Sequence, residues 1–171
     1  EYFSKAAKLG NSAALNNLGN CYTHGDGVEK DLQKAFQYYQ ESSNQGNSTA
    51  MWNLGNCYFK GKGVDIDIEK AFEFYLNSAN KGNPTAMKSV GDFYKNGIVV
   101  EKDISKAIDF YTRASNLGNS NATFELADYY YSNAGEMKTD YSKAMEFYQK
   151  SFEQGNKKAS YKIKEIQNQD K

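Results

Sequence analysis

The sequence predicts an all-α fold: an α/α superhelical solenoid of about four and a half helix–turn–helix repeats. Three series of residues recur at a step of 36 and support this prediction. The first two series are Gly10, Gly46, Gly82 and Gly118, and Leu18, Leu54, Val90 and Leu126. The third consists of the pairs Lys34-Ala35, Lys70-Ala71 and Lys106-Ala107, and a fourth pair, Lys143-Ala144, comes one residue late. We therefore place a one-residue insertion after Ala127.

The first helix of each repeat is expected to begin just after a Gly-Asn pair. Asn47, Asn83 and Asn119 stand where an N-cap side chain would bind the first helical turn. In the second repeat, Ala50, Leu54 and Tyr58 recur every four residues and predict one apolar helix face. The glycines of residues 61–63 predict the end of this helix, because glycine readily adopts left-handed backbone angles.

The second helix is expected to begin at an aspartate N-cap, which is Asp67 in the second repeat. Its buried stripe is predicted to contain Ala71, Phe72, Tyr75 and Ala79. We expect the helix to stop before Gly82, with this glycine as its C-cap.

These residues resemble the Sel-1-like repeat family, a relative of the tetratricopeptide repeat. Residues 46–82 nearly spell out the family pattern A-x3-LG-x2-Y-x2-G-x-GV-x2-D-x2-KA-x3-Y-x3-A-x2-G, and residues 10–46 match it closely. The third repeat departs at Val99, where a second loop glycine is expected, and the fourth at Ala127 and in the loop from Ser132 to Thr139. The resemblance implies a right-handed superhelix that serves as a scaffold or adaptor for protein–protein interaction.

We assign the whole chain, 1–171, to a single domain of this kind. The full repeats are predicted at residues 10–45, 46–81, 82–117 and 118–154. Residues 1–9 match the end of a second helix, so we expect the chain to be part of a longer polypeptide. Residues 155–171 are predicted to form a C-terminal capping helix and tail, with Ala159 and Ile163 at core positions and a polar outer face.

Composition argues against several functional classes. Lys and Arg number 21, as do Asp and Glu, so the chain lacks the basic surplus of nucleic-acid binders. No apolar run reaches the roughly 20 residues of a membrane span. Cys21 and Cys57 lie one repeat apart and are expected to be reduced thiols buried in the core. A cytoplasmic location follows as an expectation, while the endoplasmic reticulum lumen and secretion stay open because Asn47 and Asn121 match a glycosylation pattern.

No motif predicts catalysis, a metal site or a cofactor. The pairs Gly25/Gly27 and Gly61/Gly63 follow a helix, whereas a dinucleotide-binding loop follows a strand, so they are interpreted as turns. His24 is the only histidine and is expected to lie at the surface beside a loop.

The resemblance also implies that the first helices line a concave groove, where a partner protein or an extended peptide would bind. By register with tetratricopeptide relatives, the groove residues of the first repeat are Asn16, Asn17, Asn20 and Thr23, and those of the second are Trp52, Asn53, Asn56 and Phe59. The third repeat contributes Lys88, Ser89, Asp92 and Lys95, and the fourth Phe124, Glu125, Asp128 and Tyr131.

Two features single out the first two repeats. Asn17/Asn53 and Asn20/Asn56 are expected to form two ladders of amides outside the core, able to donate to and accept from an extended peptide. Trp52, the only tryptophan, is the type of residue that dominates interface energetics. The opposing interpretation is that asparagine reflects a bias in composition and that Trp52 packs between repeats.

Two other functions are weighed against this one. Some cysteine-rich bacterial relatives have been linked to binding or hydrolysis of β-lactams, but their cross-linking cysteines are absent here. The chain could instead be a structural spacer in a larger protein, which would show no partner. We predict a protein-binding scaffold that is not an enzyme.

Overall fold

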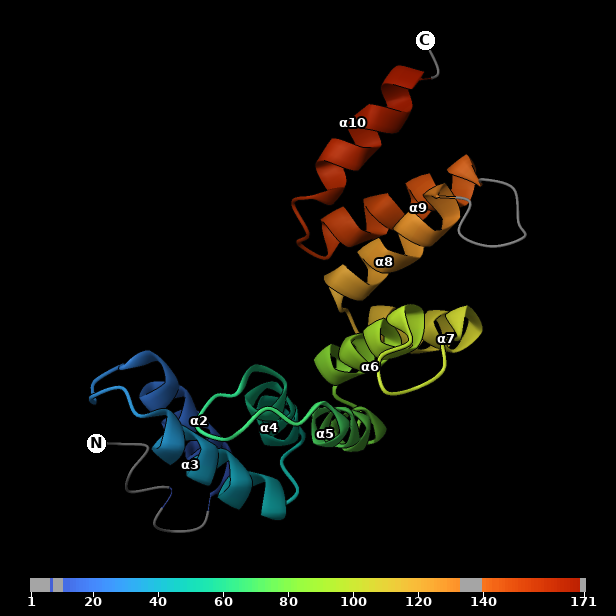
Figure 1. Ribbon diagram of the computed structural model, residues 1–171. Coiled ribbons are helices and arrows are strands. Elements are labelled where there is room, and N and C mark those ends of the chain that lie inside the picture. Colours follow the sequence, from blue (N-terminus) through green and yellow to red (C-terminus); the bar gives the residue numbers. More distant parts are fainter. Residues whose placement is uncertain (1–6, 8–10, 133–139, 170–171) are drawn as a thin grey trace. The chain divides into compact units, whose positions relative to one another are not determined.

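The computed structural model describes residues 7, 11–132 and 140–169, which form α-helices joined by turns and contain no strand (Figure 1). The first helices of the repeats are α2 (Ser12–His24), α4 (Ser48–Lys60), α6 (Pro84–Asn96) and α8 (Ser120–Tyr131). The second helices are α3 (Leu32–Asn44), α5 (Ile68–Asn80), α7 (Ile104–Asn116) and α9 (Tyr141–Glu153), and α10 (Ala159–Gln169) follows them. The predicted all-α repeat fold is confirmed.

Asparagine caps the first helices, as predicted. The Asn47 side-chain oxygen accepts the backbone N–H of Ala50 at 3.0 Å, which satisfies a donor that the first turn leaves unpaired. The same bond joins Asn11 to Ala14, Asn83 to Ala86 and Asn119 to Ala122.

The recurring Lys-Ala pair belongs to the start of each second helix. Asp67 Oδ1 accepts the backbone N–H of Lys70 at 2.9 Å, and Asp67 Oδ2 lies 3.0 Å from Lys70 Nζ. The same ammonium lies 5.6 Å from the centre of the Tyr58 ring, within the range of a cation–π contact. Ala71 follows at a fully buried position. Lysine and alanine are therefore paired in sequence because one supports the cap and the other packs in the core.

Glycine is the C-cap of α2 and α4, whereas Ser132 is the C-cap of α8. In the second repeat, glycine also permits close packing. Gly61 adopts a left-handed φ of 65°, and Gly63 follows with φ of 74°. A Cβ on Gly63 would lie 2.1 Å from the backbone oxygen of Leu32 in the preceding repeat. Val99 keeps the left-handed φ, at 65°, without being glycine, and it is the one such residue in the described ranges.

The end of α5 differs by one residue from the prediction. The helix stops at Asn80, and its C-cap is Lys81, with φ of −85°, rather than Gly82. The Lys81 N–H donates to the carbonyls of Asn77 and Ser78, which tightens the last turn. Gly82 follows with φ of 86° and reverses the chain toward the next repeat.

The core of each repeat is thin because small residues let two helices approach closely. In the second repeat, Ala50, Leu54, Ala71 and Tyr75 are all buried. A Cβ built on Gly55 would lie 2.5 Å from Cε1 of Tyr75, so the two helices meet there as predicted. The same approach joins Gly19 to Tyr39 and Gly91 to Tyr111.

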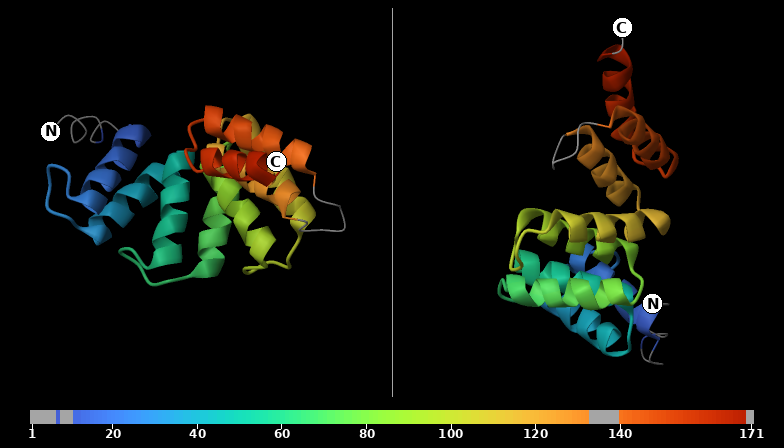
Figure 2. Two further views of the ribbon diagram at one scale, coloured as in Figure 1. Left: turned by 90° about the horizontal axis from the view of Figure 1, so that it is seen from above. Right: turned by 90° about the vertical axis from the view of Figure 1, so that its right-hand side faces the viewer.

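Contacts divide the chain into two units, Glu1–Ala86 and Met87–Lys171, and each is described by itself. In the N-terminal unit, α2 packs on α3, α3 on α4 and α4 on α5 (Figures 1 and 2). In the C-terminal unit, α7 packs on α8, α8 on α9 and α9 on α10. Gly91 in α6 contacts Tyr111 in α7. Each unit thus buries its apolar residues between helices that are neighbours in sequence.

At the C-terminal end, α10 packs on α9 through Ala159 and Ile163, which were predicted, and through Ile166, which was not. Ala159 and Ile166 are buried, and Ile163 packs against the same cluster. Tyr161 is 75% exposed, in keeping with the predicted outer face of a capping helix. The predictions for residues 1–9, apart from Ala7, and for residues 133–139 lie outside the described residues.

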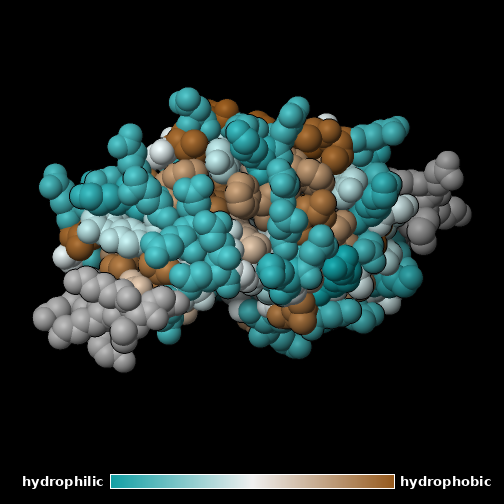
Figure 3. Space-filling view, turned by 90° about the horizontal axis from the view of Figure 1, so that it is seen from below, coloured by the Kyte–Doolittle hydropathy of each residue, from teal (hydrophilic) through white to brown (hydrophobic). Residues whose placement is uncertain are grey.

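The face shown in Figure 3 is mainly hydrophilic, with hydrophobic side chains showing between polar ones. Within the described ranges, no helix combines the length and the apolar content that crossing a membrane requires.

Candidate functional site

A cleft of about 500 Å³ lies in the N-terminal unit beside the first helices α2 and α4. Five of the residues predicted to face a partner line it: Asn20, Thr23, Trp52, Asn53 and Asn56. The other lining residues are His24, Tyr39, Thr49, Cys57, Lys60 and Lys62. The cleft therefore gathers side chains from both repeats of this unit into one surface.

The Asn20 and Asn56 amides are half-buried and line the cleft, and each also accepts a hydrogen bond from a tyrosine of the second helix. The Tyr75 hydroxyl donates to Asn56 Oδ1 at 3.0 Å, and the Tyr39 hydroxyl donates to Asn20 Oδ1 at 2.8 Å. The repeat register could not predict these hydrogen bonds, because the donors belong to the second helices. Burial raises the pKa of Tyr39, so its hydroxyl stays protonated and able to donate.

The predicted Asn17/Asn53 ladder is replaced by a hydrogen bond between Asn53 and Asn16. Asn53 Nδ2 donates to Asn16 Oδ1 at 2.9 Å, whereas the prediction paired Asn53 with Asn17. Asn16 is buried, and Asn17 is half-buried and does not line the cleft. This bond joins the first helices of adjacent repeats. It uses the N–H₂ group of Asn53, and the side-chain oxygen of Asn53 takes no part in it.

Trp52 lines the cleft as a half-buried side chain, whereas Phe59 is 37% exposed and is not among the lining residues. Sequence reasoning missed the basic residues at the same cleft, namely His24, Lys60 and Lys62. His24 and Lys60 end their helices, and Lys62 lies between two turn glycines. Their position at the ends of the first helices was the available indication.

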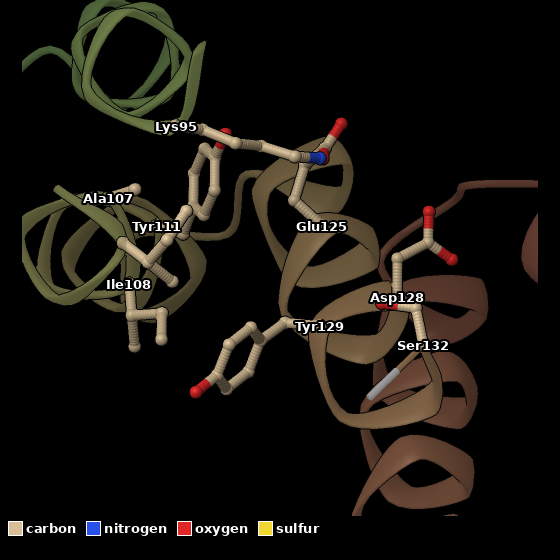
Figure 4. Close-up of a pocket in the computed structure, with 9 residues that line it drawn as sticks. Lys95, Ala107, Ile108, Tyr111, Glu125, Asp128, Tyr129 and Ser132 are labelled. Carbon is tan, nitrogen blue, oxygen red and sulfur yellow. The ribbon is translucent and has the colours of Figure 1, made fainter. Parts of the chain in front are cut away.

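In the C-terminal unit, the predicted residues of the third repeat form ion pairs. Lys88 Nζ lies 2.8 Å from Asp92 Oδ2 and 3.7 Å from Glu125 Oε1. Lys95 Nζ lies 2.7 Å from Glu125 Oε2, and Figure 4 shows its side chain reaching from α6 toward α8. Burial lowers the pKa of Lys95, but the hydrogen bond to Glu125 and the nearby carboxylates together outweigh this effect, and the pKa is raised overall.

The position of Asn20 and Asn56 is taken by carboxylates in this unit. The Tyr111 hydroxyl donates to Asp92 Oδ1 at 2.8 Å, and the Tyr148 hydroxyl donates to Asp128 Oδ1. Burial raises the pKa of Asp128 despite this hydrogen bond. All four repeats thus keep the tyrosine bond, while its acceptor changes from an amide to an acid.

The remaining predicted residues of the fourth repeat contact neighbouring helices. Phe124 packs edge-on against Tyr148, with ring centroids 5.3 Å apart. The Tyr131 hydroxyl donates to Glu165 Oε1 of α10 at 3.0 Å, and Lys162 Nζ lies 5.2 Å from the centre of the Tyr131 ring. These side chains take part in the packing of α8 on α9 and α10.

A second cavity, of about 60 Å³, lies between α6, α7 and α8 (Figure 4). Its apolar lining includes Ile104, Ile108 and Tyr129, and Lys95 and Glu125 lie at its edge as an ion pair. This volume holds only a few water molecules or a small apolar group, so the larger cleft is the better candidate site.

The thiols and the histidine show no catalytic arrangement. Cys21 and Cys57 are free, and burial raises the pKa of Cys57 to about 11. Cys21 is only half-buried, which corrects the prediction that both thiols lie in the core. His24 is exposed, as expected. Across the described part of the chain, no three His, Cys, Asp or Glu side chains are grouped to hold a metal ion.

Solved structures similar to this chain include a Sel1 repeat protein from Oxalobacter formigenes, with 30% identity and a TM-score of 0.88 over 95% of this chain. A protective antigen of uropathogenic Escherichia coli with an SLR fold is 31% identical, with a TM-score of 0.84 over 96% of the chain. An immunity protein from Pseudomonas aeruginosa is 29% identical, with a TM-score of 0.68 over 92% of the chain. The chain spans 66%, 35% and 58% of these proteins, in that order.

A comparison with curated protein sequences finds no match. The family model described as Sel1 repeat matches residues 1–11, 12–47, 48–83, 84–119 and 120–156. Its full repeats begin two residues after the starts predicted from the glycine spacing, where the first helices begin. The repeat spacing, the tyrosine-bonded helix pairs and this match over most of the chain agree, and the chain belongs to the Sel1 repeat family.

Proposed function

We propose that this chain is a protein-binding module that holds an extended segment of a partner protein in the cleft of its N-terminal unit. Sel1 repeats generally serve as scaffolds for protein–protein interaction. The observation that supports this site is the presence of amide donors, an amide acceptor and a tryptophan around one cleft of about 500 Å³.

The polar groups suit an extended backbone, which presents alternating N–H and C=O groups. The side-chain oxygens of Asn20 and Asn56 accept hydrogen bonds from tyrosine hydroxyls. The N–H₂ groups of the same two asparagines can therefore donate to a ligand carbonyl. The Asn53 amide has the opposite polarity, because its nitrogen donates to Asn16 and its oxygen can accept a ligand N–H. The cleft can thus bind both kinds of backbone group.

Trp52 supplies the apolar part of the proposed site. Tryptophan is enriched at interface positions whose truncation weakens binding most, because it buries a large surface. Trp52 lines the cleft together with Asn53 and Thr49, so an apolar side chain of the segment would pack on its ring while neighbouring amides bind the backbone.

The test is selection of short peptides from a random display library by the whole chain, followed by titration of the selected peptides. Trp52→Ala should weaken their binding by about 2 kcal/mol or more. Gln37→Ala is the matched control, because Gln37 is exposed on the second helix α3 and does not line the cleft. Melting curves of both variants establish that the fold is retained.

Binding that survives Trp52→Ala but fails in Gln37→Ala would place the site on the second helices instead. A library that yields no binding peptide would favour the spacer alternative. That the chain is not an enzyme stays a prediction.

A further inference from the structure

The cleft in the N-terminal unit has an unbalanced charge. Lys60 and Lys62 line it, and neither forms an ion pair with any residue that the structure describes. No aspartate or glutamate is among the described residues that line the cleft. The two ammonium groups therefore give the cleft a positive potential that no carboxylate in its lining offsets.

On the corresponding helix face of the C-terminal unit, the lysines are paired with carboxylates. Lys88 pairs with Asp92 and Glu125, and Lys95 pairs with Glu125. Asp92 and Asp128 occupy the positions that Asn20 and Asn56 hold in the N-terminal unit. The excess of positive charge is thus a property of the cleft and not of the repeat itself.

The amides of the cleft add to this preference. Tyr39 and Tyr75 donate to the oxygens of Asn20 and Asn56, which occupies one acceptor site on each oxygen and leaves both N–H₂ groups able to donate to a ligand. Two N–H₂ groups and two ammonium groups all favour ligand groups that accept hydrogen bonds. Hydrogen bonds from charged donors to carboxylates are among the strong hydrogen bonds of proteins.

We propose that the cleft selects an acidic extended segment, with carboxylate side chains at Lys60 and Lys62 and an apolar side chain on Trp52. This inference rests on the proposed function and adds the chemistry of the partner. Side chains two residues apart in an extended segment point to the same face, so acidic and apolar residues at every second position can face the cleft together.

The repeats themselves supply a variant that changes the charge of the cleft and keeps the fold. Asp92 and Asp128 show that a carboxylate at this position accepts the same tyrosine hydroxyl. Asn56→Asp therefore keeps an acceptor for Tyr75 and places a negative charge beside the proposed ligand. The double variant Lys60→Gln/Lys62→Gln removes the positive charges without adding a negative one.

The experiment titrates the whole chain with three labelled extended peptides that share the same apolar positions and carry Glu, Gln or Lys between them. The Glu peptide should bind about tenfold or more tightly than the Gln peptide, because complementary charge discriminates between partners. Asn56→Asp and the double variant should each weaken the Glu peptide by about tenfold or more. The double variant should weaken the Gln peptide much less than the Glu peptide, because the Gln peptide has no carboxylates. Asn56→Asp also removes an N–H₂ group that donates to the ligand backbone, so it should weaken the Gln peptide too, but by less than the Glu peptide. Asp92→Asn is the control, because it changes charge in the other unit, and it should alter neither affinity.

Equal affinity for the Glu and Gln peptides would overturn the acidic preference and leave the proposed peptide site standing. Preferential binding of the Lys peptide would overturn it as well. If the Glu peptide binds tightly but neither cleft variant weakens it, the acidic segment binds elsewhere and the assignment to this cleft fails. Failure of the proposed function is distinguishable, because none of the three peptides would then bind and library selection would yield none.

Discussion

The Tyr75 hydroxyl donates a hydrogen bond to the side-chain oxygen of Asn56, 3.0 Å away, while its ring packs against Gly55. Two adjacent residues of the first helix thus hold one tyrosine of the second, one by close approach and the other by a hydrogen bond. The bond recurs from Tyr39 to Asn20, from Tyr111 to Asp92 and from Tyr148 to Asp128. This contact fixes how the two helices of a repeat pack together.

Removing the Tyr75 hydroxyl should therefore destabilise the N-terminal unit. Tyr75→Phe keeps the ring against Gly55 but deprives Asn56 of its donor, and a hydrogen bond of this kind contributes about 1 kcal/mol. The measurement is the free energy of unfolding from denaturant titration. Tyr38→Phe is the control, because the Tyr38 ring stacks on Tyr22 and no hydrogen bond of its hydroxyl is found in the described part of the chain. An equal loss in both variants would contradict the role given to the hydroxyl.

Adding one methyl group at Gly55 should also destabilise the fold, although alanine favours a helix more than glycine does. The new Cβ would lie 2.5 Å from Cε1 of Tyr75, and overpacking of this kind costs about 1–3 kcal/mol. In the fourth repeat, Ala127 occupies the same position beside a fully buried Tyr148. Ala127→Gly should lose up to about 1 kcal/mol through lower helix propensity. A rise in melting temperature for Gly55→Ala would mean that the tyrosine ring moves freely.

The repeat spacing was sufficient to predict the helices and their N-caps, since N-capping and close packing are encoded within one repeat. Asn47, Asp67 and Gly55 could be assigned because each acts on residues nearby or at a fixed step. The bonds from Tyr75 to Asn56 and from Asn53 to Asn16 could not be predicted in this way. They depend on how far side chains reach between helices, whereas register gives only the face on which a residue lies. The positive charge of the cleft was missed for the same reason. Lys60 lies at the end of α4 and Lys62 in the turn that follows, and only the folded chain places them beside the predicted residues.

Val99→Gly should stabilise the C-terminal unit. Val99 has a φ of 65°, where a β-branched residue is strained by about 1–3 kcal/mol. Glycine relieves that strain but makes the unfolded chain more flexible, which offsets about 0.4–1 kcal/mol. We expect a net gain of about 1 kcal/mol in the free energy of unfolding, since a side chain that is 50% exposed loses little burial.

The reciprocal change at Gly63 is the control for Val99→Gly. Gly63→Val adds a Cβ only 2.1 Å from the Leu32 backbone oxygen, so it should cost far more than strain alone. A Cβ on Gly27 would have no neighbouring atom within 4 Å, so the loss of stability in Gly27→Val should reflect the backbone strain alone. A destabilising Val99→Gly would indicate that the valine side chain makes a contact that outweighs its strained backbone.

The two thiols should react with an alkylating reagent at clearly different rates. Burial raises the pKa of Cys57 to about 11, so little thiolate is present near neutral pH, and the sulfur is also covered. Cys21 is half-buried and should react first. Mass spectrometry of the native protein over time should show one modification per chain before the second. Cys57→Ser should remove only the slow phase, and loss of the fast phase instead would reverse the assignment.

Acid should weaken the second helices through their aspartate caps. The backbone N–H of Lys70 lowers the pKa of the Asp67 carboxyl below its ordinary value of 3.8. The carboxyl therefore keeps its charge to lower pH when folded than when unfolded, and the unfolded chain binds more protons over that interval. Its contribution to stability is complete above the unfolded pKa and is lost as the pH falls through the folded one.

Asp67→Asn tests this titration, because asparagine caps a helix about as well as aspartate but carries no charge. Unfolding of the wild type and of Asp67→Asn should be compared at neutral pH and at several values down to strong acid. The stability advantage of the wild type should shrink toward zero as the pH falls through the folded pKa of Asp67. The reciprocal control is Asn47→Asp, which places a carboxylate at the N-cap of α4 and should acquire the pH dependence that Asp67→Asn lacks. A constant difference between the wild type and Asp67→Asn at every pH would show that the cap acts through hydrogen-bond geometry and not through its charge.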